Sequence, residues 1–170
     1  GFGEALARDA RHVPALLGRG NSRQMLGDDV GAIADYEAVT AIDPQEAVPY
    51  VNRGTIRYLR SEFSQAERDY DAALERNETC IEAWIGTGLV RWKLEDPTGA
   101  VRALDRALQL APDELKALLK RAEIKRRCGD KPGAHADFER AVKAHPESAE
   151  ALVRRGYSWM DKERYAEGLA

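Results

Sequence analysis

The side chains of this sequence that could take part in catalysis or metal binding are three histidines and two cysteines. His12, His135 and His145 lie far apart, and nothing at helical spacing from them completes a metal site. Cys80 and Cys128 lack zinc-type spacing. We interpret them as unpaired thiols of a reducing compartment, hence of a cytoplasmic protein, with a regulatory disulfide as the alternative. The sequence therefore predicts no catalytic residue, no metal and no cofactor.

The composition excludes some classes of partner. The chain has 170 residues, of which 44% are hydrophobic and 32% are charged, with a net charge of -3. A net charge this close to zero argues against nucleic acid as a partner. No apolar stretch approaches the roughly 18 residues that a membrane helix needs, so we expect no membrane insertion.

The sequence repeats itself every 34 residues without a gap. Because glycines recur in this frame, they indicate close helix packing rather than a phosphate-binding loop. The columns of small residues are Gly20, Gly54, Gly88, Ala122 and Gly156, then Ala32, Ala66, Ala100, Ala134 and Gly168. The columns of large residues are Leu16, Tyr50, Trp84, Leu118 and Leu152, then Phe2, Tyr36, Tyr70, Leu104 and Phe138.

Each repeat is predicted to form two helices, A and B. Turn-forming pairs divide the repeats in the middle, at Gly27-Asp28, Ser61-Glu62, Asp96-Pro97 and Gly129-Asp130. In the third repeat we expect helix A over 82–94 and helix B over 98–110. A single helix pair cannot bury its apolar face alone, so neighbouring repeats must stack.

This pattern resembles the tetratricopeptide repeat family. Arg19-Gly20 in helix A and Ala34-Asp35-Tyr36 in helix B match a common variant of its motif. The resemblance implies an all-α, right-handed superhelical solenoid of antiparallel helix pairs, with a concave groove lined by the A helices. The expected repeats span 13–46, 47–80, 81–114, 115–148 and 149–170, the last truncated in helix B. Residues 1–12 match the tail of a preceding repeat, so we expect the array to continue on both sides.

The stripe of each helix A opposite the core is expected to face this groove and to bind a peptide. It is apolar in the middle of the array and basic in the fourth repeat. Two alternatives stay open: the apolar side chains pack between A helices, and the basic ones are a solvated face. The expected groove residues are Asn21, Val51, Asn52, Tyr58, Ile85, Leu89, Trp92, Lys116, Lys120, Arg126 and Arg127.

Two further columns predict structural ion pairs between the helices of a repeat. The third repeat changes both columns at once, to Thr87 and Ala103. Pairing within a repeat explains this joint loss, and pairing to the next repeat does not. The predicted charge-assisted pairs are Arg19 with Asp35, Arg53 with Asp69, and Arg121 with Asp137.

The sequence thus predicts a non-catalytic protein–protein interaction scaffold. Its expected partners are other proteins or peptides, including ones with acidic segments. One alternative is a scaffold that self-associates through its repeat ends. The other is the regulatory repeat region of an enzyme whose catalytic domain lies outside this sequence.

Overall fold

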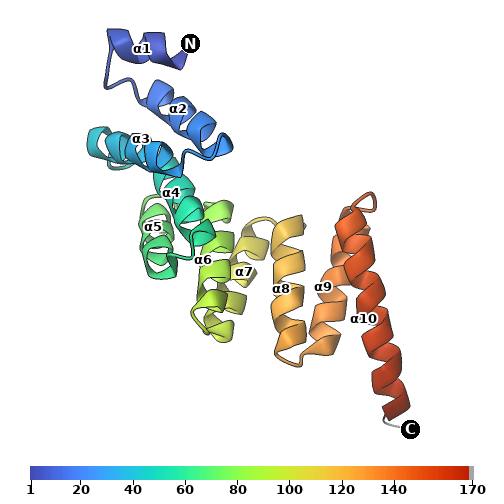
Figure 1. The fold of residues 1–170 in the computed structure, drawn as a ribbon. Coiled ribbons are helices and arrows are strands. Elements are labelled where there is room, and N and C mark those ends of the chain that lie inside the picture. The colour runs from blue at the N-terminus through green and yellow to red at the C-terminus, as the bar shows by residue number, and fades with distance from the viewer. Residues whose placement is uncertain (169–170) are drawn as a thin grey trace. The chain divides into compact units, whose positions relative to one another are not determined.

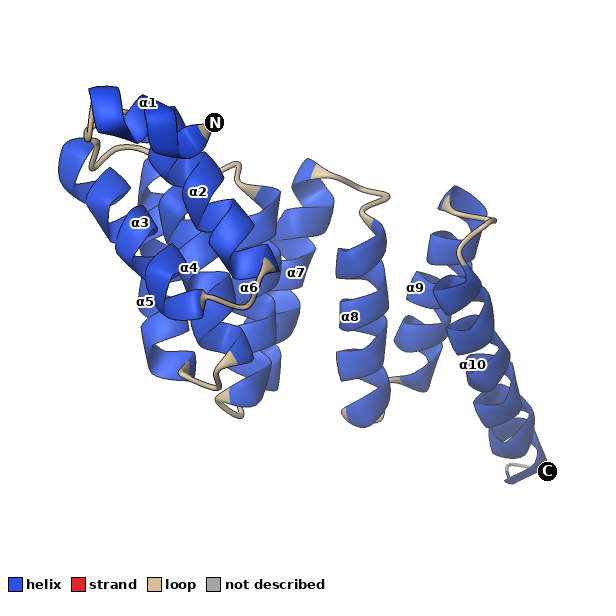
Figure 2. Ribbon diagram, turned by 45° about the horizontal axis from the view of Figure 1, so that its top comes forward, coloured by secondary structure: helices blue, strands red, loops and turns tan. Residues whose placement is uncertain are grey.

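The computed structural model describes residues 1–168, and their regular structure is entirely helical (Figures 1 and 2). Side chains are described for residues 1–159, Arg8 excepted. The helices are α1 (Phe2–Arg8), α2 (Val13–Met25), α3 (Asp29–Ile42), α4 (Val48–Leu59), α5 (Phe63–Arg76), α6 (Ile81–Lys93), α7 (Pro97–Leu110), α8 (Leu115–Arg127), α9 (Lys131–Ala144) and α10 (Ala149–Gly168).

The chain divides into two compact halves in the middle of α6. The N-terminal half comprises Gly1–Gly86 and the C-terminal half Thr87–Ala170. In the N-terminal half, α2 packs against α3 and α4 against α5. In the C-terminal half, α8 packs against α9, and α9 against α10. Three of these contacts, α2 with α3, α4 with α5 and α8 with α9, are the pairs of helices A and B that the repeat predicts. The fourth joins helix B of the fourth repeat to helix A of the fifth.

The turn between helices A and B has the same backbone conformation in four repeats. Its residue is left-handed each time, with φ of 80° at Gly27, 61° at Ser61, 63° at Glu95 and 90° at Gly129. In three repeats the next residue is an aspartate, whose side chain accepts a hydrogen bond from a backbone N–H of the first turn of helix B. The residue with left-handed backbone ends helix A. The aspartate that follows it in three repeats caps the start of helix B.

The fifth repeat lacks the turn that was expected between its helix A and helix B. α10 is one continuous helix from Ala149 to Gly168. Glu163 and Arg164 occupy the two columns that form the turn in the other repeats. Both residue types are good helix formers, so the helix continues where the turn is otherwise found.

In the first three repeats, the core of the helix pair is an aromatic or aliphatic side chain of helix B seated on a glycine of helix A. Tyr36 of α3 is fully buried, and its ring lies against Gly20 of α2. A Cβ atom added at Gly20 would lie only 2.7 Å from the nearest carbon of this ring. In the C-terminal half, Leu104 of α7 takes the same place on Gly88 of α6. The repeating glycine therefore sets how closely the two helices approach.

Gly20 and Gly156 share a repeat column but have opposite surroundings, which gives a matched test. Gly20→Ala should lower the free energy of unfolding by about 1–3 kcal/mol, because the Tyr36 ring has to move. No atom of the described residues lies within 4 Å of a Cβ at Gly156, so Gly156→Ala should raise the free energy of unfolding by about 0.5–1 kcal/mol through helix propensity. Urea unfolding followed by circular dichroism measures both. Shifts in the same direction would contradict this account of the column.

Candidate functional site

Three repeats have a buried aspartate in helix B that contacts helix A. Asp35 and Asp69 are each 2% exposed, and Asp137 is 5% exposed. Each binds the arginine sixteen residues earlier through both carboxylate oxygens. The Nη2–Oδ1 distances are 2.6 Å for Arg19 with Asp35, 2.6 Å for Arg53 with Asp69, and 2.5 Å for Arg121 with Asp137. All three contacts join the two helices of one repeat, as the columns predict.

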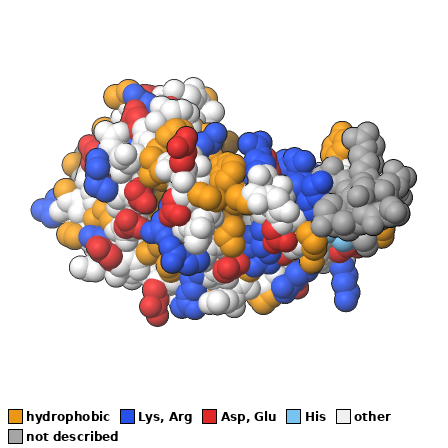
Figure 3. Space-filling view, turned by 90° about the horizontal axis from the view of Figure 1, so that it is seen from below, with side chains coloured by type: hydrophobic (Ala, Val, Ile, Leu, Met, Phe, Trp, Pro, Cys, Tyr) orange, Lys and Arg blue, Asp and Glu red, His pale blue; other side chains and the backbone are white. Residues whose placement is uncertain are grey.

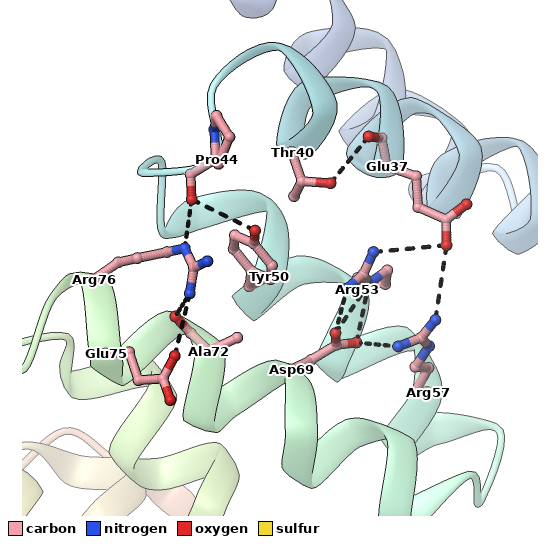
Figure 4. Close-up of polar contacts among 10 residues, drawn as sticks. All are labelled: Glu37, Thr40, Pro44, Tyr50, Arg53, Arg57, Asp69, Ala72, Glu75 and Arg76. Atoms are coloured by element: carbon pink, nitrogen blue, oxygen red, sulfur yellow. Dashed lines mark hydrogen bonds and ion pairs between the residues drawn. The ribbon is translucent and has the colours of Figure 1, made fainter.

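Each aspartate also binds a second base, which the sequence analysis did not assign. Arg23 lies 2.8 Å from Asp35, Arg57 lies 2.8 Å from Asp69, and Lys125 lies 3.0 Å from Asp137. These bases stand four residues after the first arginine, one turn further along helix A. Figure 4 shows Asp69 between Arg53 and Arg57. The regular i, i+4 spacing of the bases was the signal that could have identified them.

The same arginines reach an acidic residue of the preceding repeat. Arg53 and Arg57 lie 3.6 and 3.8 Å from Glu37, and Arg121 lies 2.6 Å from Asp105. Burial lowers the pKa of Arg53. Its hydrogen bond to Asp69 and the charges of Asp69 and Glu37 raise the pKa by more than burial lowers it, so the pKa lies above its ordinary value. Arg53 therefore stays charged. These contacts join the second repeat to the first and the fourth repeat to the third.

The third repeat buries small side chains in place of the pair. Thr87 and Ala103 are each 1% exposed. The Thr87 hydroxyl oxygen has no hydrogen-bond partner among the described residues. Ala103 stands where the other repeats have the buried aspartate. Without a buried carboxylate there is no charge for an arginine at position 87 to neutralise.

In the N-terminal half, the expected groove asparagines take part in a polar network. Asn21 Oδ1 accepts hydrogen bonds from the Tyr36 hydroxyl at 2.7 Å and from Asn52 Nδ2 at 3.0 Å. Burial raises the pKa of Tyr36, so its hydroxyl keeps the proton that it donates. Asn21 and Asn52 thus connect α2 to α4, and part of their hydrogen-bonding capacity is already used.

The apolar residues expected in the same groove differ in what they expose. Val51 and Tyr58 are half-buried, and the Tyr58 ring lies 5.8 Å from that of Phe63. Ile85 is only 4% exposed, so it packs in the interior and offers almost no surface to a ligand. Its branched side chain is buried because this part of α6 contributes to the core, where the neighbouring Gly86 lies against the Tyr70 ring.

A second contact between repeats closes the turn after α3. The Arg76 guanidinium lies over the Tyr50 ring, 4.3 Å from its centroid. Both side chains donate hydrogen bonds to the carbonyl oxygen of Pro44 (Figure 4). Position 50 belongs to a large-residue column, and its role here is to hold the turn against α5.

In the C-terminal half, apolar and basic side chains lie together. Leu89 and Trp92 of α6 are half-buried, and the Arg127 guanidinium lies 5.9 Å from the Trp92 ring centroid. Lys116, Arg126 and Arg127 are exposed on α8, and Lys120 is partly exposed. On the face drawn in Figure 3, lysine and arginine side chains (blue) are interspersed with apolar ones (orange). We call the set Leu89, Trp92, Lys116, Lys120, Arg126 and Arg127 the C-terminal A-helix face.

A glutamate of α8 lies among these bases. Glu123 lies 3.7 Å from Lys120, 3.3 Å from Arg127 and 3.5 Å from Arg154 of α10. Beside it, a pocket of about 550 Å³ opens between α8 and α10. Its walls are Arg126, Ala149, Glu150, Val153, Arg154 and Tyr157. Glu123, Glu150, Val153, Arg154 and Tyr157 lie on the helix A stripe that the sequence places toward the groove, but the sequence did not indicate a pocket among them.

The histidines make structural contacts. His12 caps α2 by accepting a hydrogen bond from the backbone of Ala15, and His145 contacts the carbonyl oxygen of Asp113 at 2.6 Å. His135 lies 2.8 Å from the Ser158 hydroxyl. Within the described residues, no three His, Cys, Asp or Glu side chains come together as a metal site would require. In that part of the chain, no helix is both long and apolar enough to cross a bilayer.

Arg53 and Arg57 contact both a buried carboxylate, Asp69, and an exposed one, Glu37, so the two carboxylates can be compared by mutation. Asp69→Ala should lower the free energy of unfolding by roughly 2–4 kcal/mol, because Arg53 and Arg57 lose a shared buried acceptor. Glu37→Ala removes only longer contacts of a side chain that is 52% exposed, so it should cost less than about 1 kcal/mol. Equal losses in urea unfolding of the two variants would rule out the structural role of the buried carboxylate.

Comparison with known proteins identifies the repeat. The family model described as Tetratricopeptide repeat matches residues 52–114 and 119–170. No curated protein matches the chain.

Solved structures share the fold. TTC0263, a thermophilic TPR protein in Thermus thermophilus, has a TM-score of 0.79 at 20% identity, covering 94% of this chain and 87% of its own. YrrB, a TPR protein with an unusual peptide-binding site, has a TM-score of 0.75 at 21% identity, covering 95% and 84%. The first TPR of Spaghetti (RPAP3), bound to the HSP90 peptide SRMEEVD, has a TM-score of 0.67 at 25% identity, covering 71% and 96%. The chain belongs to the tetratricopeptide repeat family, and its all-α array of antiparallel helix pairs is the fold of that family.

Proposed function

We propose that this protein is a non-catalytic interaction scaffold whose A helices bind a segment of a partner protein. The observation that carries the proposal is the C-terminal A-helix face, where the half-buried Trp92 lies next to Arg127 and α8 adds three further bases to the same set. Aromatic and arginine side chains are the types that dominate binding energy at protein interfaces. A solvated helix face has no need of a large aromatic side chain at its surface.

The chemistry of this face favours a segment with acidic and apolar side chains. Trp92 and Leu89 offer apolar surface, while the bases of α8 offer charge-assisted hydrogen bonds to carboxylates. Two related folds support a peptide as the ligand. YrrB has a peptide-binding site, and the Spaghetti repeat binds SRMEEVD, a peptide with three acidic residues. We infer a ligand of the same general kind for this chain.

Self-association is a second candidate function, favoured by the surface of α10. Its Leu152, Val153, Tyr157 and Trp159 are between 39% and 63% exposed. An apolar surface of this kind is typical of contacts between proteins. Light scattering over a range of protein concentrations tests it: a mass that stays at one chain excludes self-association.

The interaction function is tested by variants of the full-length protein in pull-downs quantified by mass spectrometry. Trp92→Ala should weaken binding of the specific partner about tenfold at every salt concentration, because a buried aromatic anchor is lost. Lys120→Glu should slow association and reduce its salt dependence, since exposed charges act over about 10 Å at 0.1 M salt.

The control has the same charge change on helix B. Arg102→Glu places it on an exposed position of α7, away from the A helices, and should leave binding unchanged. If the partner binds the Trp92→Ala, Lys120→Glu double variant as tightly as the wild type, the partner does not use the A helices and the proposal fails.

A further inference from the structure

The pocket between α8 and α10 and the glutamate beside it suggest a specific subsite. We propose that this pocket receives an apolar side chain flanked by acidic residues of the partner segment, and that Glu123 occupies the place of one ligand carboxylate until the segment binds. This inference rests on the proposed function and names the kind of segment recognised. Glu123 is thus an internal competitor that determines specificity.

The arrangement of charge on α8 and α10 follows from helical spacing. On α8, Lys116, Lys120, Glu123 and Arg127 follow one another at three- and four-residue steps, so they share one stripe. On α10, Glu150 and Arg154 are four residues apart and lie 3.0 Å from each other. The bases of this surface are Lys116, Lys120, Arg126, Arg127 and Arg154, and its acids are Glu123 and Glu150, which leaves it three charges positive.

The geometry of Glu123 shows that its contacts are weak enough to exchange. Its three contacts, at 3.3–3.7 Å, are longer than the 2.7–2.9 Å typical of charge-assisted hydrogen bonds. The buried Asp137 of the same half binds Arg121 at 2.5 Å and Lys125 at 3.0 Å. The Glu123 side chain is 24% exposed, so water reaches it. Because long, solvent-accessible ion pairs contribute little free energy, a ligand carboxylate can displace Glu123 from these bases.

The walls of the pocket select the neighbouring side chain. Val153 and Tyr157 are 56% and 63% exposed, although both are large and apolar. Arg126 and Arg154 border them on opposite helices. An apolar side chain placed here would cover Val153 and Tyr157, while acidic residues on either side of it would reach the arginines. Neither an entirely apolar nor an entirely acidic segment matches both parts of the surface.

Two blocked, fluorescein-labelled peptides of equal length and charge test the proposal. Both carry two glutamates on each side of a central residue, which is leucine in one and glycine in the other. Fluorescence anisotropy at low salt and at a monomeric protein concentration measures binding. The leucine peptide should bind wild-type protein about 3–10-fold more tightly than the glycine peptide, and Tyr157→Ala should abolish that preference.

The role of Glu123 is tested with a matched charge control. Glu123→Gln should bind the leucine peptide about 3–10-fold more tightly, because Lys120 and Arg127 lose their contact with its carboxylate and Arg154 keeps only Glu150 among the described residues. Glu147→Gln removes the same charge from an exposed position on the loop before α10, and should change affinity less than about twofold. Circular dichroism verifies folding, and Glu123→Ser repeats the measurement if the glutamine variant is unstable.

Three results would overturn the inference. They are equal effects of Glu123→Gln and Glu147→Gln, equal binding of the two peptides to the wild type, and no binding of the leucine peptide at millimolar concentration. Each leaves the proposed function standing if Trp92→Ala still releases the protein partner. Retention of the partner by the Trp92→Ala, Lys120→Glu double variant refutes the proposed function itself.

Discussion

A buried carboxylate that must be neutralised governs how the two helices are joined in the first, second and fourth repeats. Asp69 cannot stay ionised in the interior without partners, because burying an unpaired charge costs several kcal/mol. Arg53 and Arg57 supply those partners from helix A, at 2.6 and 2.8 Å. The direction of both arginines fixes the rotation of helix A about its axis. That rotation decides which side chains of helix A point to the core and which to solvent.

Close packing acts on the same helices and gives the same orientation. Tyr36 lies on Gly20, so the helices approach at one place along their length. The tyrosine hydroxyl then reaches Asn21, which also accepts a hydrogen bond from Asn52 of the next helix A. A small residue, an aromatic ring and a buried ion pair thus agree on one geometry, which is the mark of a sequence that specifies a single fold. The third repeat shows that the ion pair is replaceable, because Thr87 and Ala103 bury small side chains instead.

The contrast between Asp137 and Glu123 separates structure from binding in one half of the molecule. Both carboxylates contact several bases, but Asp137 is 5% exposed and lies at short distances from them, whereas Glu123 lies at the surface with longer contacts. A buried carboxylate is held because no water can replace its partners. A surface carboxylate competes with water and with any other anion, so it leaves its bases available to a ligand.

The repeat, the pairing of the helices and the first arginine partner of each buried aspartate were predictable from the sequence. These follow from local spacing: the small columns, the turn residues and the joint loss of Arg and Asp at Thr87 and Ala103 are all visible in one dimension. Which residues of the stripe remain on the surface depends on the packing of neighbouring helices, which the sequence does not show. Ile85 and Leu89 both belong to the expected stripe, yet the first is buried and the second is half-buried. Exposure depends on how closely the neighbouring helix approaches, and the pattern of repeat columns does not give the distance between helices. The same reason hid the contacts of Glu123 and the pocket beside α10, because the residues that form them come from two helices whose approach is set by packing.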